Sequence, residues 1–314
     1  MRAAETLKRL IEEVGRVVVG QRELVDGLLI GLLARGHVLV EGVPGLAKTT
    51  AVRTLAEALG LGFQRIQFTP DLLPGDLLGT PIYVPDRQRF SVRKGPIFSP
   101  VLLADEINRA PAKVQSALLE AMEERQVTIG EETFALPEPF LVMATQNPLE
   151  LEGTYPLPEA QTDRFLMKLA VGYPSADEER EIVARDAGPA HAVRAVADAA
   201  AIAEMRRAAA ALHVAPAVAD YAVRLVRATR ERSTAQAWEG QVALGASPRA
   251  SIFLVRAARA RALLDGRDFA TPYDVKRVAP DVLRHRILLS YEAEADGVRP
   301  EDVVTALLAA VELP

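Results

Sequence analysis

Hydrophobic positions follow two different patterns along the first half of the chain. Leu7, Leu10 and Val14 recur at helical spacing, which predicts a helix with one apolar face. This pattern covers residues 1–35 with a break at 17–21. Further along, short uncharged runs predict buried strands, and longer periodic stretches predict helices. The expected strands are 37–40, 63–68, 101–104, 140–145 and 165–171, and the expected helices between them are 50–59 and 113–124.

Strands that alternate with helices favour a parallel sheet with crossover connections. We therefore expect an α/β domain over residues 1–173, built on a five-stranded parallel sheet flanked by helices. Two stretches of this domain have strand-like flanks around a turn and predict hairpin inserts at about 70–98 and 126–137. They are either surface hairpins without a role or functional inserts.

The pattern changes at Tyr173-Pro174-Ser175. From there to the end the chain is helical and rich in Ala and Arg, is punctuated by Gly and Pro, and has no clear strand run. This predicts a second, smaller, all-helical lid domain over residues 174–314.

The turn after the first strand carries the strongest chemical signal. Its residues are Gly42, Val43, Pro44, Gly45, Leu46, Ala47, Lys48, Thr49 and Thr50. A loop of this kind points backbone N–H groups at phosphates. Lys48 would reach the β- and γ-phosphates of ATP, and the Thr49 hydroxyl would bind Mg²⁺. The common pattern has Gly directly before the Lys. Because Ala resists a positive φ, we expect Ala47 to have right-handed, helix-like dihedral angles.

Polar residues follow two later strands, at the sheet edge where ligands bind. Asp105 would hold Mg²⁺ opposite Thr49, and Glu106 would orient and deprotonate the attacking water. Without the phosphate loop, the same two acids would be interpreted as a helix cap. Asn147 is the first candidate for a hydrogen bond to the γ-phosphate, with Gln146 and Thr145 as weaker ones, although Asn147-Pro148 is also an ordinary turn signal.

Two arginines are candidates for contacts to the triphosphate. Arg164 opens the last strand, where it could reach the nucleotide of a neighbouring subunit or form a local salt bridge. Arg249 follows Ser247-Pro248 at the start of a helix, and an arginine on a lid helix could contact the γ-phosphate and report its loss.

Composition and net charge restrict the kinds of site, partner and cellular compartment that we expect. The 314 residues are 49% hydrophobic and 25% charged, with a net charge of −5 and no Cys. This excludes disulfides and thiolate metal sites and argues against a protein that coats nucleic acid. There is no uncharged apolar run long enough for a membrane span, and Met1–Glu5 opens an amphipathic helix and not a signal peptide. We expect a cytoplasmic protein without membrane insertion.

Together these motifs resemble the MoxR family of AAA+ ATPases, in the branch with magnesium-chelatase and minichromosome-maintenance subunits. The resemblance covers residues 5–312. Ala47 departs from the general loop but agrees with this family. The segments that carry the resemblance are 19–21 (VGQ), 42–49 (GVPGLAKT), 68–74 (FTPDLLP), 104–110 (ADEINRA), 144–148 (ATQNP), 159–165 (EAQTDRF) and 245–250 (GASPRA).

The resemblance implies roles that the residues alone do not give. Val19, Gly20 and Gln21 would contact adenine, Asn147 would be sensor 1, Arg164 the arginine finger and Arg249 sensor 2. The first insert resembles a helix-2 insert and the second a pre-sensor-1 hairpin, both facing a central pore. The family implies ATP and Mg²⁺ as cofactors and a homo-oligomeric ring, commonly a hexamer. It also implies chaperone-like remodelling of protein complexes with a von Willebrand factor A domain partner.

Three other functions compete with protein remodelling. A nucleic-acid motor or loader is the main alternative, because Arg87, Arg89, Arg93 and Lys94 make the first insert basic. The acidic tip of the second insert, Gly130-Glu131-Glu132, would repel a phosphate backbone, so we expect no nucleic-acid partner. A small-molecule kinase fits less well, because the finger-like Arg164 favours a ring ATPase. A nucleotide-gated scaffold without turnover fits less well, because Glu106 is present to activate water.

Overall fold

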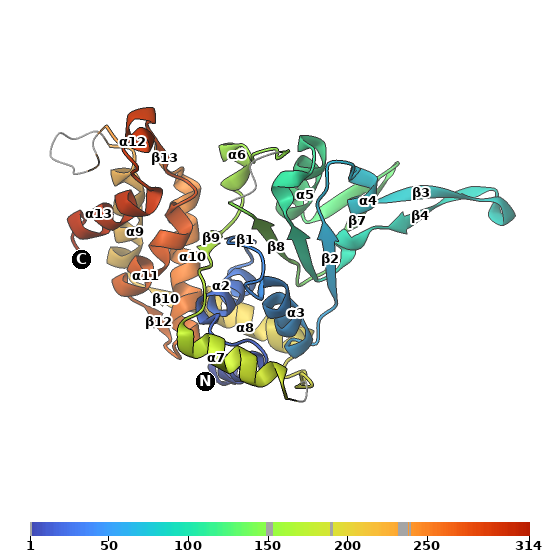
Figure 1. Ribbon diagram of the computed structural model, residues 1–314, viewed down its shortest axis with the longest axis horizontal. Helices are drawn as coiled ribbons and strands as arrows, with labels where there is room; N and C mark the ends of the chain where they lie inside the picture. The colour runs from blue at the N-terminus through green and yellow to red at the C-terminus, as the bar shows by residue number, and fades with distance from the viewer. Residues whose placement is uncertain (1, 149–152, 189–190, 232–237, 239) are drawn as a thin grey trace.

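The core of the protein is a five-stranded, entirely parallel sheet with strand order β2-β5-β8-β1-β9 (Figure 1). The computed structural model describes residues 2–148, 153–188, 191–231, 238 and 240–314. The strands are β1 (Val38–Glu41), β2 (Phe63–Gln67), β5 (Val101–Asp105), β8 (Leu141–Gln146) and β9 (Met167–Ala170). The predicted fold class is confirmed, and each expected strand occurs within three residues of its predicted ends.

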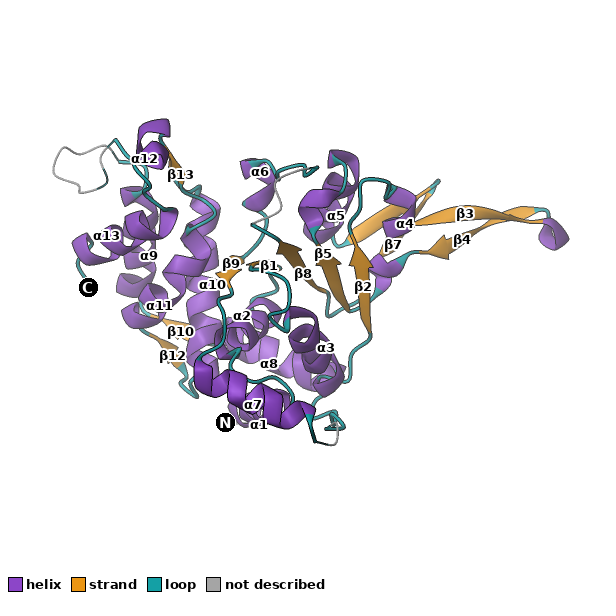
Figure 2. Ribbon diagram, viewed as in Figure 1, coloured by secondary structure: helices purple, strands orange, loops and turns teal. Residues whose placement is uncertain are grey.

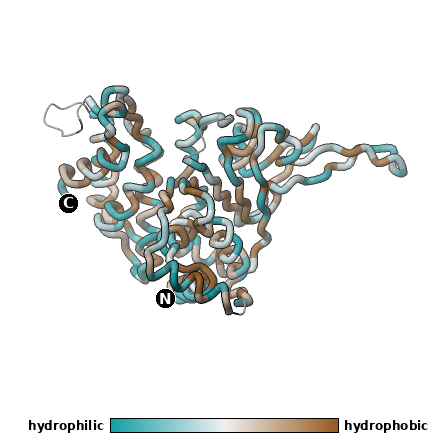
Figure 3. The backbone as a smooth tube through the Cα atoms, in the orientation of Figure 1, coloured by the Kyte–Doolittle hydropathy of each residue, from teal (hydrophilic) through white to brown (hydrophobic). Residues whose placement is uncertain are grey.

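Side chains of successive strand residues point to opposite faces of a sheet, and this alternation gives the protein two hydrophobic cores. Val38, Val40 and Leu103 belong to the core on one face, whereas Leu39 and Leu102 belong to the core on the other. Both faces are therefore covered by helices, as the apolar runs 101–104 and 141–144 of the central strands require. Hydrophobic segments gather at the centre of the fold in Figure 3.

Helices cover the sheet on both sides (Figures 1 and 2). The first core joins the sheet to α1 (Arg2–Gly15), α2 (Arg22–Leu33) and α3 (Lys48–Ala58). The second joins it to α4 (Pro74–Leu78), α5 (Ala112–Glu124) and the 3₁₀ turns η2 (Pro96–Phe98) and η3 (Ile107–Arg109). A short helix, α6 (Glu159–Thr162), precedes β9.

Both predicted inserts are hairpins. Strands β3 (Gly79–Val84) and β4 (Arg89–Lys94) pair antiparallel around η1 (Pro85–Arg87) and project from the body as a long arm (Figure 2). At the base of this arm, Gly79 has φ +106, and a Cβ on it would lie 2.7 Å from the Gly95 nitrogen. Only glycine fits this crossing. The second hairpin pairs β6 (Gln126–Ile129) with β7 (Glu132–Ala135).

The C-terminal part is helical, and its helices join the first core. Ile202, Leu225 and Leu254 cluster with the helices beneath the sheet. Two short strand pairs, which the helical pattern did not predict, brace this part. The helices are α7 (Ala176–Asp186), α8 (Ala199–Ala211), α9 (Pro216–Ala228), α10 (Pro248–Leu264), α11 (Pro272–Leu283), α12 (Tyr291–Ala295) and α13 (Pro300–Ala310). The strand pairs are β10 (His213–Val214) with β12 (Phe269–Ala270) and β11 (Val242–Leu244) with β13 (Leu288–Leu289). Within the described residues, none of the helices combines the length and the apolar character that crossing a bilayer requires.

Candidate phosphate-binding and catalytic site

The loop between β1 and α3 has the shape that the sequence predicts, with one correction. Ala47 has φ 55° and ψ 20°, in the left-handed region, so the expectation of right-handed dihedral angles is wrong. Gly45, two residues earlier, also has a positive φ, of 86°. The chain enters α3 from this loop through this left-handed residue, and the cost to an alanine is about 1 kcal/mol. Left-handed residues of this kind form the concave nests of N–H groups that bind anions.

Lys48 is the first residue of α3, and its side chain turns back over the loop. Its Nζ donates hydrogen bonds to the carbonyl oxygens of Gly42 and Val43, the latter at 3.0 Å. Burial lowers the pKa of the ammonium, whereas the nearby carboxylates of Asp105 and Glu106 raise it. The cation is thus held inside the loop, within the same cavity as two acids.

Thr145 joins the carboxyl ends of β5 and β8. Its hydroxyl donates to Asp105 Oδ1 at 2.5 Å and accepts from the backbone N–H of Glu106 at 2.9 Å. Glu106 has φ 55°, so the backbone turns sharply between the two acids. We had considered Thr145 as a weaker candidate for a phosphate contact. In the structure it is buried and positions Asp105 and Glu106.

Two residues of β2 also contact the acids, and the sequence analysis missed both. Arg65 donates to Asp105 Oδ2 through Nε at 3.0 Å and Nη2 at 2.6 Å. Gln67 donates to Glu106 Oε2 at 2.7 Å, and Arg109 donates to the same oxygen at 3.1 Å. Residues 65 and 67 share one face of the strand. The alternation of polar residues along β2 was a signal in the sequence for a polar strand face. The sequence does not show that this face lies beside the acids, because that follows only from the pairing of β2 with β5.

These elements enclose a cavity of about 480 Å³. The loop residues Gly42, Pro44, Gly45, Leu46, Ala47, Lys48, Thr49 and Thr50 line it, together with Arg65, Asp105, Glu106, Thr145, Gln146 and Asn147. Asn147 is buried, at 6% exposure. The structure therefore brings together the predicted loop, both acids and the predicted polar residues after β8.

The donor set of this cavity fits Mg²⁺. Thr49 and Asp105 offer a hydroxyl and a carboxylate oxygen, which are hard ligands. Within the described ranges, no group of three or more His, Cys, Asp or Glu side chains gathers into a metal cage. Mg²⁺ at phosphate sites uses one or two protein oxygens and completes its shell with water and phosphate, so a full protein cage is not required.

Val19, Gly20 and Gln21 are not among the residues that line the cavity. They precede α2, and Gly20 has φ +75. A Cβ on Gly20 would lie 2.6 Å from the carboxylate of Glu178. Glu178 belongs to the capping box that opens α7, so the C-terminal helices close over this segment. Its contact with adenine stays a prediction.

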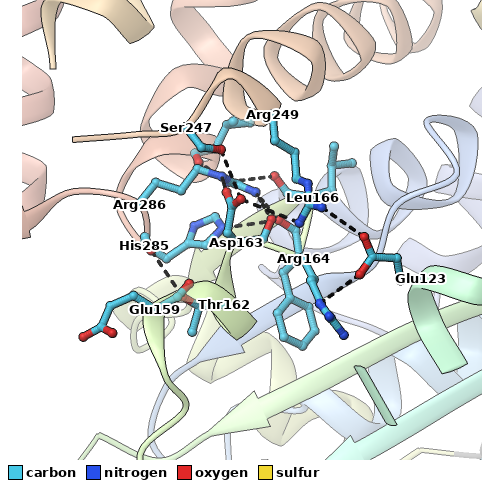
Figure 4. A network of polar contacts seen from close by, with 12 residues as sticks. Glu123, Glu159, Thr162, Asp163, Arg164, Leu166, Ser247, Arg249, His285 and Arg286 are labelled. Atoms are coloured by element: carbon cyan, nitrogen blue, oxygen red, sulfur yellow. Dashed lines mark hydrogen bonds and ion pairs between the residues drawn. The ribbon is translucent and has the colours of Figure 1, made fainter. Parts of the chain in front are cut away.

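Arg164 and Arg249 lie together and do not line the phosphate cavity (Figure 4). Both bind Glu123 near the end of α5: Arg164 Nε lies 3.0 Å from Oε2, and Arg249 Nη2 lies 3.0 Å from Oε1. Arg249 is also 3.6 Å from Asp163 Oδ2. One carboxylate therefore holds both arginines, although one comes from the α/β domain and the other from α10.

Arg286 anchors the segment that carries Arg164 (Figure 4). Its side chain is only 1% exposed and donates to Asp163 Oδ1 at 2.7 Å. It also donates to the carbonyl oxygens of Asp163 and Phe165. Ser247 donates to the other carboxylate oxygen of Asp163 at 3.1 Å. Two segments of the C-terminal part thus hold the start of the last strand.

Comparisons with known proteins agree with this geometry. Residues 37–167 match the model of the ATPase family associated with various cellular activities (AAA), and residues 234–307 match an AAA lid domain. The chain is 54% identical to chaperone MoxR1 of Mycobacterium tuberculosis, over 98% of this chain and 82% of the relative. It is 35% identical to MoxR of Methylorubrum extorquens, over 98% and 94%.

A crystal structure also resembles the protein closely. It is that of a candidate ATPase from Cytophaga hutchinsonii, with a TM-score of 0.93 and 48% identity. The likeness covers 99% of this chain and 96% of the other.

The ion pair between Arg65 and Asp105 generates a prediction about Mg²⁺. Arg65 occupies Oδ2 of Asp105 while Thr145 occupies Oδ1, so Arg65 would compete with Mg²⁺ for this carboxylate, and we expect Arg65→Gln to lower the Mg²⁺ concentration for half-maximal nucleotide binding. About threefold to tenfold is reasonable for losing one charge-assisted, partly exposed contact. The measurement is a Mg²⁺ titration of fluorescent ATP binding, with Arg180→Gln on α7 as control. A rise in the Mg²⁺ requirement would mean that Arg65 supports the metal instead of competing with it.

Proposed function

The chain belongs to the MoxR family of AAA+ ATPases, and we propose that it forms a homo-oligomeric ring, commonly a hexamer, that hydrolyses ATP with Mg²⁺ to remodel protein complexes. One observation carries this proposal. The groups for phosphate binding and water activation share one cavity, whereas the two candidate arginines are held together outside it. A second copy is then needed to bring those arginines to a nucleotide.

The residues of the cavity divide the chemistry between them. Lys48 would exchange the carbonyls of Gly42 and Val43 for the β- and γ-phosphates. Mg²⁺, held by Thr49 and Asp105, would neutralise charge on the phosphates when bound. Glu106 would take a proton from a water molecule as the oxygen of that water forms a bond to the γ-phosphorus of ATP. At the same time the bond between the γ-phosphorus and the departing ADP oxygen would break.

Gln67 holds the Glu106 carboxylate by a hydrogen bond to one oxygen, Oε2. The second oxygen, Oε1, would receive the proton.

Glu106→Gln tests the role of this base. An amide cannot accept the proton, so turnover should fall by about 10² or more while ATP binding is retained. Steady-state phosphate release and nucleotide titration measure the two effects, and Glu124→Gln, an exposed acid on α5, is the control. Turnover near that of the unchanged chain would remove Glu106 from the mechanism.

Arg164 and Arg249 should both act on the nucleotide of a neighbouring subunit. Because Glu123 holds them together, we expect Arg164→Ala and Arg249→Ala each to bind ATP but to hydrolyse it poorly. Mixing either variant with Lys48→Ala subunits should restore part of the activity. Lys48→Ala supplies intact arginines, and the other variant supplies an intact phosphate loop.

The mixing experiment separates the two arginines. Co-assembly is checked by light scattering, and self-mixed Lys48→Ala is the baseline. If Arg164→Ala is rescued and Arg249→Ala is not, Arg249 contacts the nucleotide of its own subunit. If neither is rescued in proven mixed rings, neither arginine acts across the interface.

The client is proposed to be a protein, with a von Willebrand factor A domain protein as the partner that the family resemblance suggests. The β3–β4 arm supports this. It exposes Tyr83 and Phe90, which stack edge to face at 5.4 Å. Exposed aromatic residues are typical anchors of protein interfaces. Arg89, Arg93 and Lys94 lie on the same arm, and they are the residues that would bind a phosphate backbone if the nucleic-acid alternative were correct. The side chain of Arg87 lies outside the described part of the chain.

The arm allows both alternatives to be tested in one experiment. Phe90→Ala should reduce capture of a purified von Willebrand factor A domain protein by the Glu106→Gln ring in ATP. The same substitution in the otherwise unchanged chain should leave basal ATPase activity intact. Arg89→Gln with Arg93→Gln is the matched control and should have a smaller effect. Several-fold stimulation of the ATPase by DNA, abolished by the arginine substitutions, would favour the motor.

A further inference from the structure

A second cavity, of about 610 Å³, lies where α2, α8 and α10 meet (Figure 1). Its described lining contains the arginines Arg35, Arg206, Arg207, Arg256 and Arg259, one carboxylate, Glu138, and an apolar wall that includes Leu33, Pro139 and Ile202. None of these residues lines the phosphate cavity. We call it the arginine cavity.

Arg206 is the most buried charge of the arginine cavity. Its side chain is 4% exposed, its Nε donates to the Leu32 carbonyl at 2.7 Å, and its Nη1 donates to Glu138. Its Nη2 has no partner among the described residues, and neither has the buried Nε of Arg259. A buried N–H without an acceptor is costly, and more so on a charged group. Two residues of the cavity lining therefore each have a buried donor without a partner among the described residues.

Positive charge here exceeds negative charge. Glu138 is shared, because Arg35 also lies 3.8 Å from it. Burial, together with the charges of Arg125 and Arg35, lowers the pKa of Arg206 to about 10. Arg35 and Arg256 also line an adjoining cavity of about 210 Å³, where Glu123 is the only acid among the described lining residues. The two cavities together form a continuous basic region.

Three of the five arginines have no compensating acid one turn away on their own helix. Arg227 on α9 and Arg185 on α7 each pair with an acid four positions away, which is the usual arrangement on a helix surface. Arg206, Arg256 and Arg259 have no acidic residue three or four positions away in the sequence. Their counter-charge must come from elsewhere in the fold or from a ligand.

We propose that the arginine cavity is a second anion site, and that its ligand is a phosphate chain. Guanidinium groups bind phosphate oxygens by paired hydrogen bonds, and several converge here. The chain can come from inorganic pyrophosphate or from a nucleotide, whose apolar base would lie against the wall that contains Leu33 and Ile202.

The arginine cavity shares α10 with one of the two arginines bound by Glu123. Arg249 is near the start of this helix, and Arg256 and Arg259 lie about two and three turns further on. A bound anion would tie α10 to α2 and α8 and so fix the helix that presents Arg249. The site does not depend on hydrolysis, and its test is independent of the proposed ATPase activity.

The test uses the full-length Lys48→Ala chain, in which the phosphate loop is disabled. Pyrophosphate and ATP are titrated separately by calorimetry at physiological ionic strength, with thermal melting as a second readout. We expect at least one of them to bind and to raise the melting temperature. Binding of pyrophosphate identifies the phosphate chain alone as sufficient, and binding of ATP alone identifies a nucleotide.

Substitutions on α10 locate the site. Arg256→Gln with Arg259→Gln should weaken binding by about tenfold or more, as expected for the loss of charge-assisted hydrogen bonds. Arg256 is exposed and Arg259 is partly exposed at the cavity wall, so the double variant should still fold. Its melting temperature without ligand checks that it does. Arg180→Gln with Arg227→Gln removes the same charge elsewhere and should leave binding unchanged. Absence of binding by both ligands, or equal binding by the α10 variant, would overturn the proposal.

Discussion

The hydroxyl of Thr145 fixes the arrangement of the two acids in the phosphate cavity. A hydroxyl can donate and accept at once, and here it donates to Asp105 and accepts from the N–H of Glu106. This locks the carboxyl end of β8 to that of β5. The left-handed turn at Glu106 then sends the two carboxylates to different partners, Asp105 to Arg65 and Glu106 to Gln67. Two acids that are neighbours in the sequence therefore have different surroundings, which is what the separate roles proposed for them require.

The sequence predicts those features whose cause is local. The strand runs, the phosphate loop and the acids after β5 follow from residues next to one another, and the fold and family are confirmed. Features that depend on the path of the chain were not predictable in this way. Ala47 takes a left-handed conformation because the loop must enter α3 there, against its own preference. Arg65 and Gln67 matter only because β2 lies beside β5, an order that no short motif encodes.

The net charge of −5 is an average that hides where the arginines lie. On α7 and α9, arginines pair with acids one turn away and contribute little beyond solubility. Around the arginine cavity, Arg206 on α8 and Arg256 and Arg259 on α10 have no such acid, and the buried Nη2 of Arg206 and Nε of Arg259 find no partner among the described residues. Charge balance in this chain therefore has to be judged region by region. An acidic total argues against coating nucleic acid, but it does not argue against binding one compact anion.

Helix α10 connects the two candidate arginines to the α/β domain. At its start, Arg249 shares Glu123 with Arg164, and the preceding Ser247 binds Asp163. Near its end, Arg261 binds Asp26 of α2 at 2.7 Å, with both side chains at least 90% buried. Breaking such a buried pair is costly, so α10 stays attached to the α/β domain at that end. Helix α10 therefore runs from a buried attachment on α2 to the pair of arginines at Glu123. Arg286, which follows α11, binds Asp163, the residue directly before Arg164. The two arginines are thus connected to the α/β domain of their own chain through one helix and three carboxylates, Asp26, Glu123 and Asp163.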